Sequence, residues 1–251
     1  MNPENAPRTV LFITTAAVVA SLLIGCAANP HSGGGTATTA TGPSLASNRF
    51  VASDGRTIDI GRSTPASGGR RFDNPHMEKG KCWLADGFDF KGFDTLLIAP
   101  TLSTAKFPDK PEDRKVHDLA KDNLVAELGR VLGERGIFAK IVTRDTDIPA
   151  GAKTLRLENT ITEFSKGGGA ARYFVGLYGG GQPILRVQGK ASAAEKTLFT
   201  YEARRSGTSA GARVGGVFMK DEDIQIEDIR SLVLDLTDFI AAIAGKYQPR
   251  H

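Results

Sequence analysis

Cysteine and histidine are the side chains of this 251-residue protein best suited to nucleophilic or metal chemistry, and there are two of the first and four of the second. A nucleophile needs a neighbouring base, and a metal site needs converging His, Cys or carboxylate ligands. Only His117 lies in an expected element, a helix in which Asp113 and Asp118 flank it and favour a solvated face. The others lie in low-complexity sequence or at the chain end (His31, His76 and His251). We therefore predict no catalytic residue, metal site or cofactor.

The thiol of Cys26 has a more specific setting. It ends the run Leu23-Ile24-Gly25-Cys26, which closes an apolar segment from Val10 to Ile24. Those fifteen residues suit the core of a signal peptide and fall short of the about 20 that a spanning helix needs. The run resembles the bacterial lipobox at all four positions. The resemblance implies cleavage between Gly25 and Cys26, lipid on Cys26 and outer-membrane sorting, because Ala27 and not Asp follows. The alternative is an uncleaved membrane helix.

The signal divides the chain into three expected parts. Residues 1–25 are the signal peptide, 26–82 a lipidated flexible tether, and 83–251 a single α+β domain. The tether is rich in Gly, Ser, Thr, Ala and Pro, and so has too little apolar surface to offset its ordering entropy. Val51, Ile58 and Ile60 could form a transient strand in it. If Cys26 carries lipid, Cys82 is either a small, half-buried apolar residue or a reactive or intermolecular thiol.

Charge narrows the class of partner. The net charge is +4 and the isoelectric point is about 9.1, with both signs interspersed along the chain. This is a mild bias toward anionic surfaces such as lipid headgroups or cell-wall polymer. Because there is no block rich in Lys and Arg, we expect no nucleic-acid partner.

Hydrophobic periodicity predicts two helices. One runs from Pro111 to about Arg135 and the other from about Asp223 to Ala244, each with apolar residues three and four apart along one face. Gly136 and Gly245 stand where a left-handed C-cap is expected. Both helices are therefore expected to be amphipathic and to pack on one face of a sheet.

Five strands are expected between and around the helices. They span residues 95–99, 137–142, 154–164, 184–193 and 197–204, the last two forming a hairpin. The third alternates between apolar and polar residues, so one of its faces is wet, and Glu158 and Glu163 are expected on opposite faces. The predicted fold is α+β, with a mixed, mainly antiparallel sheet of about five strands and the two helices on one face.

Two glycine-rich stretches, 167–181 and 206–219, interrupt this pattern and carry apolar residues between their glycines. A phosphate cradle is disfavoured because a strand, not a helix, follows Pro183. The stretches are either packing loops that cover the open face of the sheet or a contact surface for a partner. The candidate contact residues are Arg172, Tyr173, Phe174, Val175, Leu177, Tyr178, Arg213 and Phe218.

The run Arg172-Tyr173-Phe174-Val175-Gly176, followed by glycines and the strand Leu185–Val187, resembles a bacterial lipoprotein family, domain of unknown function 4410. The resemblance covers roughly Gly92 to Ala244, and departs from the family at Tyr178 and in the turn Ala194-Glu195-Lys196. It implies a lipid-anchored protein of unassigned function, with a fold related to periplasmic lipoprotein domains that regulate or assemble envelope machines. It carries over no catalytic residues.

These observations predict a lipoprotein on the periplasmic side of the outer membrane, whose domain binds an envelope protein or a second copy of itself. The alternative is an enzyme or ligand carrier acting on envelope lipid or cell-wall polymer. A contact module predicts an exposed apolar patch. An enzyme or carrier predicts an enclosed pocket with convergent polar groups.

Overall fold

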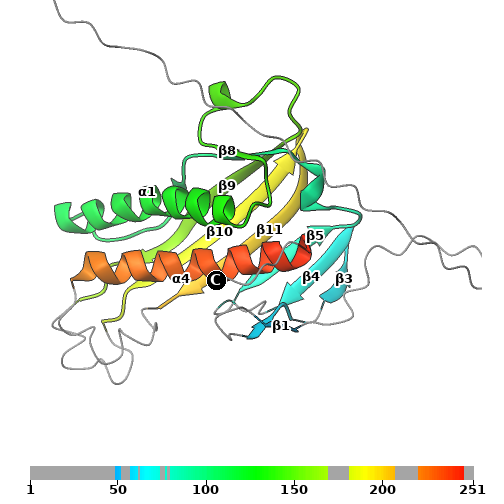
Figure 1. The fold of residues 1–251 in the computed structure, drawn as a ribbon. Helices are drawn as coiled ribbons and strands as arrows, with labels where there is room; N and C mark the ends of the chain where they lie inside the picture. Colours follow the sequence, from blue (N-terminus) through cyan, green and yellow to red (C-terminus); the bar gives the residue numbers. More distant parts are fainter. Residues whose placement is uncertain are drawn as a thin grey trace, which may run out of the picture. The chain divides into compact units, whose positions relative to one another are not determined.

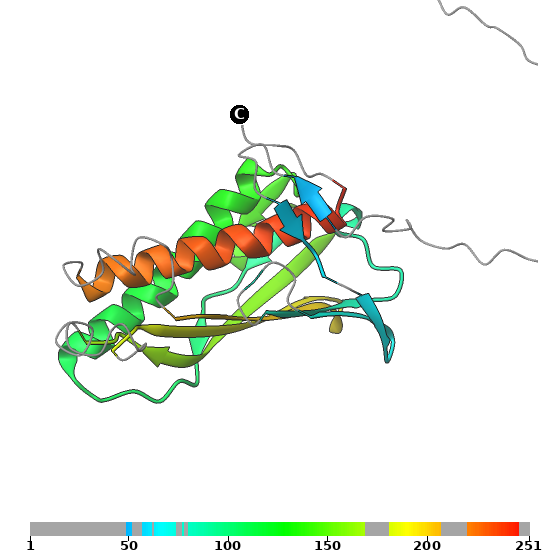
Figure 2. The same cartoon turned by 90° about the horizontal axis from the view of Figure 1, so that it is seen from below.

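Two long helices lie side by side across one face of a β-sheet (Figures 1 and 2). The computed structural model describes residues 49–51, 57–61, 63–73, 77, 80–168, 181–206 and 220–245. All of them belong to one unit, Gly42–His251. Within these residues the fold is α+β, as predicted.

The described sheet has nine strands, whereas about five were predicted. Its order begins with β3 (Ser63–Ala66), β4 (Gly69–Asp73), β5 (Lys81–Ala85) and β11 (Lys196–Arg205). It continues with β10 (Ile184–Ala193), β9 (Thr154–Ser165), β6 (Thr95–Ile98) and β8 (Lys140–Val142), and the short β7 (Leu102–Ser103) also pairs with β9. Pairing is antiparallel from β3 to β9 and parallel among β6, β7, β8 and β9. The sheet is therefore mixed and mainly antiparallel.

Three of the unpredicted strands begin inside the stretch expected to be a flexible tether. β3, β4 and the first two residues of β5 fall within residues 26–82, and a separate two-stranded sheet pairs β1 (Arg49–Val51) with β2 (Thr57–Asp59). Ile60, Phe72 and Cys82 are at most 2% exposed and join the core. The local sequence is poor in apolar residues, but β5 is ordered by its antiparallel pairing with β11. The tether prediction therefore does not hold for these strands.

Both helices lie close to where the sequence placed them. α1 spans Pro111–Glu134 and α4 spans Asp221–Ile243. Gly136 and Gly245 follow them with φ of 58°, as expected for left-handed caps. Because β6 and β8 are parallel, the segment β6-α1-β8 forms a crossover. Two short 3-10 helices, Phe90–Gly92 and Asp145–Asp147, complete the described elements.

α4 is more deeply buried than is expected of an amphipathic helix that packs on one face of a sheet. Its eight consecutive residues from Asp235 to Ala242 are all buried. Two carboxylates in this segment are paired across the interior: Asp235 with Arg205 of β11, and Asp238 with Arg135 at the end of α1. No helix in the described part of the chain is both long enough and apolar enough to span a membrane.

Candidate functional site

The site residues proposed from sequence all fall outside the described part of the chain. They are Gly25, Cys26, Arg172, Tyr173, Phe174, Val175, Leu177, Tyr178, Arg213 and Phe218. The described residues instead point to the face of the sheet that the helices leave uncovered (Figure 2).

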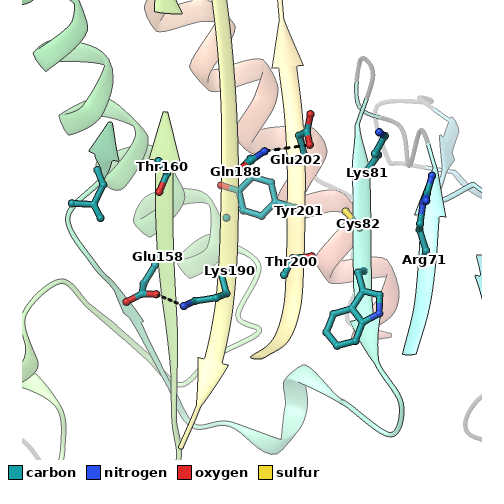
Figure 3. Close-up of a pocket in the computed structure, with 13 residues that line it drawn as sticks. Arg71, Lys81, Cys82, Glu158, Thr160, Gln188, Lys190, Thr200, Tyr201 and Glu202 are labelled. Atoms are coloured by element: carbon teal, nitrogen blue, oxygen red, sulfur yellow. Dashed lines mark hydrogen bonds and ion pairs between the residues drawn. The ribbon is translucent and has the colours of Figure 1, made fainter. Parts of the chain in front are cut away.

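Two neighbouring rows of side chains cross this open face at right angles to the strands. Cross-strand pairing runs without a break through β4, β5, β11, β10 and β9, and in the first row it extends to β7. The first row is Asp73, Lys81, Glu202, Gln188, Thr160 and Leu102. The second row is Arg71, Trp83, Thr200, Lys190 and Glu158. Every member except Asp73 lines a hollow of about 630 Å³ (Figure 3).

The carboxylates within the hollow are paired with nitrogen donors. Lys190 Nζ lies 3.0 Å from Glu158 Oε2, and Gln188 Nε2 lies 3.4 Å from Glu202 Oε2 (Figure 3). The hydrogen bond from Lys190, helped by one from Arg156, lowers the pKa of Glu158. Each carboxylate that lines the hollow thus has a nitrogen donor beside it.

A β-bulge adds Glu163 to the charged side chains on the open face. The register shifts between Arg186 and Val187 opposite β9, so Glu163 pairs with Arg186. The Arg186 guanidinium lies 3.2 Å from the Glu163 carboxylate. Glu163 therefore joins Glu158 on the open face, and the expectation that the two face opposite sides is wrong. The extra residue of a bulge reverses side-chain parity, and the sequence pattern did not reveal it.

Trp83 supplies the aromatic surface of the hollow and is itself held in place by Gly69. A Cβ on Gly69 would lie 2.9 Å from the Cε2 and Nε1 atoms of the indole and 2.2 Å from the carbonyl oxygen of Leu84. The ring therefore lies against bare backbone on β4, which only glycine permits. Trp83 remains half-buried and is one of the residues that line the hollow.

The opposite side of the same strands is closed by a buried row beneath the helices. Tyr201 lies between Gly189 and Cys82 in the cross-strand register, and its hydroxyl donates a 2.8 Å hydrogen bond to Asn159 Oδ1. Burial raises the pKa of the Cys82 thiol well above its usual value. Cys82 is free and 2% exposed, which fits the small apolar residue and not the reactive thiol.

His117 does not lie on a solvated helix face, as the sequence suggested, but is 6% exposed. The rings of Phe107 and Phe164 pack against it at centroid distances of 4.6 and 5.0 Å, and its Nε2 lies 2.8 Å from Ser103 Oγ. Burial lowers the pKa of His117, and the neighbouring Asp118 opposes that shift. The sequence does not show that Ser103 and Phe164 reach this helix.

A serine hydroxyl beside a neutral imidazole could act as a nucleophile with its base, if a third group oriented the imidazole. Here that third group would be Asp118, and it is poorly placed, because its Oδ1 lies 3.5 Å from His117 Nδ1. Ser103 Oγ also accepts a hydrogen bond from the backbone N–H of Ala105. The contacts therefore anchor β7 and the segment that follows it to α1. Among the described residues, no group of three or more His, Cys, Asp or Glu side chains could hold a metal ion.

Comparison with known proteins identifies no family. No family model matches the chain, and no curated protein matches it. The resemblance to domain of unknown function 4410 therefore stays a prediction.

Solved structures with some similarity do exist. A PelC dodecamer from Paraburkholderia phytofirmans is 12% identical, with a TM-score of 0.39 over 61% of this chain and 96% of that chain. A PelC variant dodecamer in another space group is 14% identical, with a TM-score of 0.37 over 63% and 97%. A Xanthomonas campestris protein of domain-of-unknown-function family 330 is 14% identical, with a TM-score of 0.31 over 58% and 85%. Similarity at this level assigns no function.

Proposed function

We propose that this chain is a lipid-anchored lipoprotein on the periplasmic side of the outer membrane, and that its folded domain is a binding module for an envelope component. The lipobox resemblance of Leu23-Ile24-Gly25-Cys26 supports the anchor. The hollow on the open face of the sheet carries the binding part of the proposal. Its ligand is a component of the envelope or a second copy of the chain.

The composition of the hollow resembles a binding site more than an ordinary solvated sheet face. Binding sites combine aromatic or aliphatic surface with a few placed polar groups. Here Trp83 lies toward one end of the two rows and Leu102 at the other, with amide, hydroxyl and charged groups between them. Leu102 is 65% exposed, and among the described residues it is the one large hydrophobic side chain that is exposed. Both apolar side chains border the same concavity.

The geometry supports binding better than catalysis. An acid or base for catalysis is set apart from its neighbours by its pKa. In the hollow, Glu158 and Glu202 instead share hydrogen bonds with nitrogen donors, and the pKa of Glu158 is lowered. The hollow is also open to one side, whereas an enclosed pocket was expected of a ligand carrier.

Intact-mass analysis of the membrane fraction tests the anchor. The natural chain should yield a species cleaved before Cys26 and heavier by the mass of the lipid, and Cys26→Ser should abolish it. An uncleaved, unmodified chain would overturn the anchor.

Site-specific photocrosslinking in intact cells tests the binding face. A benzophenone amino acid at Gln188 should give adducts with an envelope component, and the same group at the exposed Asp122 on α1 should not. Adducts from position 122 with none from position 188 would contradict the proposal. The glycine-rich stretches are the second candidate surface. If the envelope component binds there, changing Tyr173, Phe174 and Tyr178 together to Ala should abolish the crosslinked adducts.

A further inference from the structure

We infer that the hollow binds a neutral, hydroxyl-rich glycan strand that lies across the β-strands, with one sugar ring stacked on Trp83. This inference rests on the proposed function and names the chemistry of its ligand. It follows from the length of the hollow, its charge balance, its hydrogen-bonding groups and its aromatic surface.

The hollow suits an extended ligand. Its lining crosses from Arg71 on β4 to Leu102 on β7 through β5, β11, β10 and β9. Five steps between neighbouring strands, each of about 4.8 Å, make a path of about 24 Å. A monomeric ligand would fill only part of this path, whereas a linear polymer would contact both ends.

The charges along this path cancel when Asp73, which lies beside Arg71 but does not line the hollow, is counted with the lining residues. The two rows contain three basic side chains, Arg71, Lys81 and Lys190, and three acidic ones, Asp73, Glu158 and Glu202. Lys190 is paired with Glu158, and Arg71 with Asp73 at 2.8 Å. A polyanion binds where basic groups are in excess, and a polycation where acidic groups are. A surface whose charges are balanced and mostly paired favours an uncharged polar ligand.

Side chains, and not the backbone, supply the hydrogen-bonding groups of the hollow. The central strands β10 and β11 are each paired on both edges, so an added peptide strand would find their backbone groups occupied. A sugar hydroxyl both donates and accepts, as do Thr160, Thr200 and Gln188 in the middle of the path. These groups match a polyhydroxylated ligand better than a peptide main chain.

Trp83 adds an apolar platform to this polar path. The C–H face of a sugar ring is apolar and can pack flat on an indole, which carries a negative charge density on its face. Because Gly69 holds the indole against the backbone of β4, little side-chain entropy remains to be lost on binding. Trp83 is also the single tryptophan of the chain, so its fluorescence reports on this position alone.

Titration of neutral oligosaccharides into the purified full chain, held in a zwitterionic detergent that contains no sugar, tests the inference. The probes are maltohexaose, cellohexaose and chitohexaose, the disaccharide of each series, and oligogalacturonate and chitosan oligomers as charged controls. At least one neutral hexasaccharide should change the Trp83 fluorescence. It should bind at least about tenfold more tightly than its disaccharide, which corresponds to about 1.4 kcal/mol. Preference for a charged oligomer, no length dependence, or no binding of any neutral probe at millimolar concentration would overturn it.

Variants locate the glycan on the proposed face. Trp83→Ala should weaken binding about tenfold or more by calorimetry. Gln188→Ala and Thr160→Val keep the fluorophore and should each weaken binding severalfold, whereas Glu134→Ala on the exposed face of α1 should not. Equal affinity in all four variants would place any binding elsewhere. If no saccharide binds but position 188 still crosslinks in cells, the glycan inference fails and the binding face stands.

Discussion

The Tyr201 hydroxyl donates a 2.8 Å hydrogen bond to Asn159 Oδ1 from two strands away, and its ring crosses Gly189 on the strand between them. The three residues form one cross-strand row through β9, β10 and β11. These strands also carry the polar side chains at the centre of the hollow on their other face. The buried row therefore helps to hold the open face in shape.

Loss of the tyrosine hydroxyl should destabilise the fold. Tyr201→Phe leaves the buried Asn159 Oδ1 without its donor, and we expect the free energy of unfolding to fall by about 1–3 kcal/mol. Urea denaturation measures this. The double variant Tyr201→Phe, Asn159→Leu removes both polar partners and should recover much of the loss. A single variant as stable as the natural protein would contradict the importance of this bond.

Gly189 is the position in this row where no side chain fits. A Cβ there would lie 1.9 Å from Tyr201 Cε1, and the ring cannot move away without breaking the bond to Asn159. Gly189→Ala should therefore lower the free energy of unfolding by about 1–3 kcal/mol. Gly92→Ala is the matched control, because nothing lies within 4 Å of a Cβ at Gly92, and its effect should stay within about 0.5 kcal/mol. Equal effects of the two substitutions would show that the ring can adapt.

The ion pair between Arg135 and Asp238 should be worth far more to stability than the surface pairs of α1. The side chains of Arg135 and Asp238 are 6% and 0% exposed, and they join the end of α1 to the C-terminal part of α4. Asp238→Ala leaves a buried guanidinium without this carboxylate and should cost about 3–5 kcal/mol.

Glu134→Ala provides the comparison for that pair. It removes the exposed pair with Arg130 and should cost less than about 1 kcal/mol. Thermal and urea unfolding of the two variants measure the difference. A small loss in Asp238→Ala would mean that the helix pair is held by apolar packing alone.

The sequence predicted those helices and strands in which apolar residues recur with a regular period. The apolar spacing of α1 and α4 and the alternation in β9, β10 and β11 placed these elements within a few residues. β3, β4 and β5 were missed because their order depends on pairing with β11, more than a hundred residues later. The polar face of β9 was predicted, but the bulge that turns Glu163 to the same face was not.

The candidate site could be predicted only in part for the same reason. The solvent-facing side of β9 was expected, yet the hollow also needs Arg71 and Lys81 from the stretch taken for a tether, and Trp83 directly after it. Likewise, His117 could be assigned to a helix, but its burial depends on Phe164 and Ser103, which meet it only in the folded chain. Contacts between distant strands and helices leave no periodic signal in one sequence.

Burial of His117 should make stability depend on pH in a defined direction. Its pKa in the folded protein is lowered by burial, so the unfolded chain, with a histidine pKa of about 6.5, takes up the proton first as pH falls. The free energy of unfolding should therefore decrease as pH drops through about 6.5 toward the folded pKa. His117→Gln removes this titration but keeps a side-chain amide that can reach Ser103. Urea unfolding at pH 7.5, 6.5 and 5.5 should show a steeper loss in the natural protein than in the variant. If the two lose stability in parallel, other groups carry the pH dependence and His117 is protonated equally in both states.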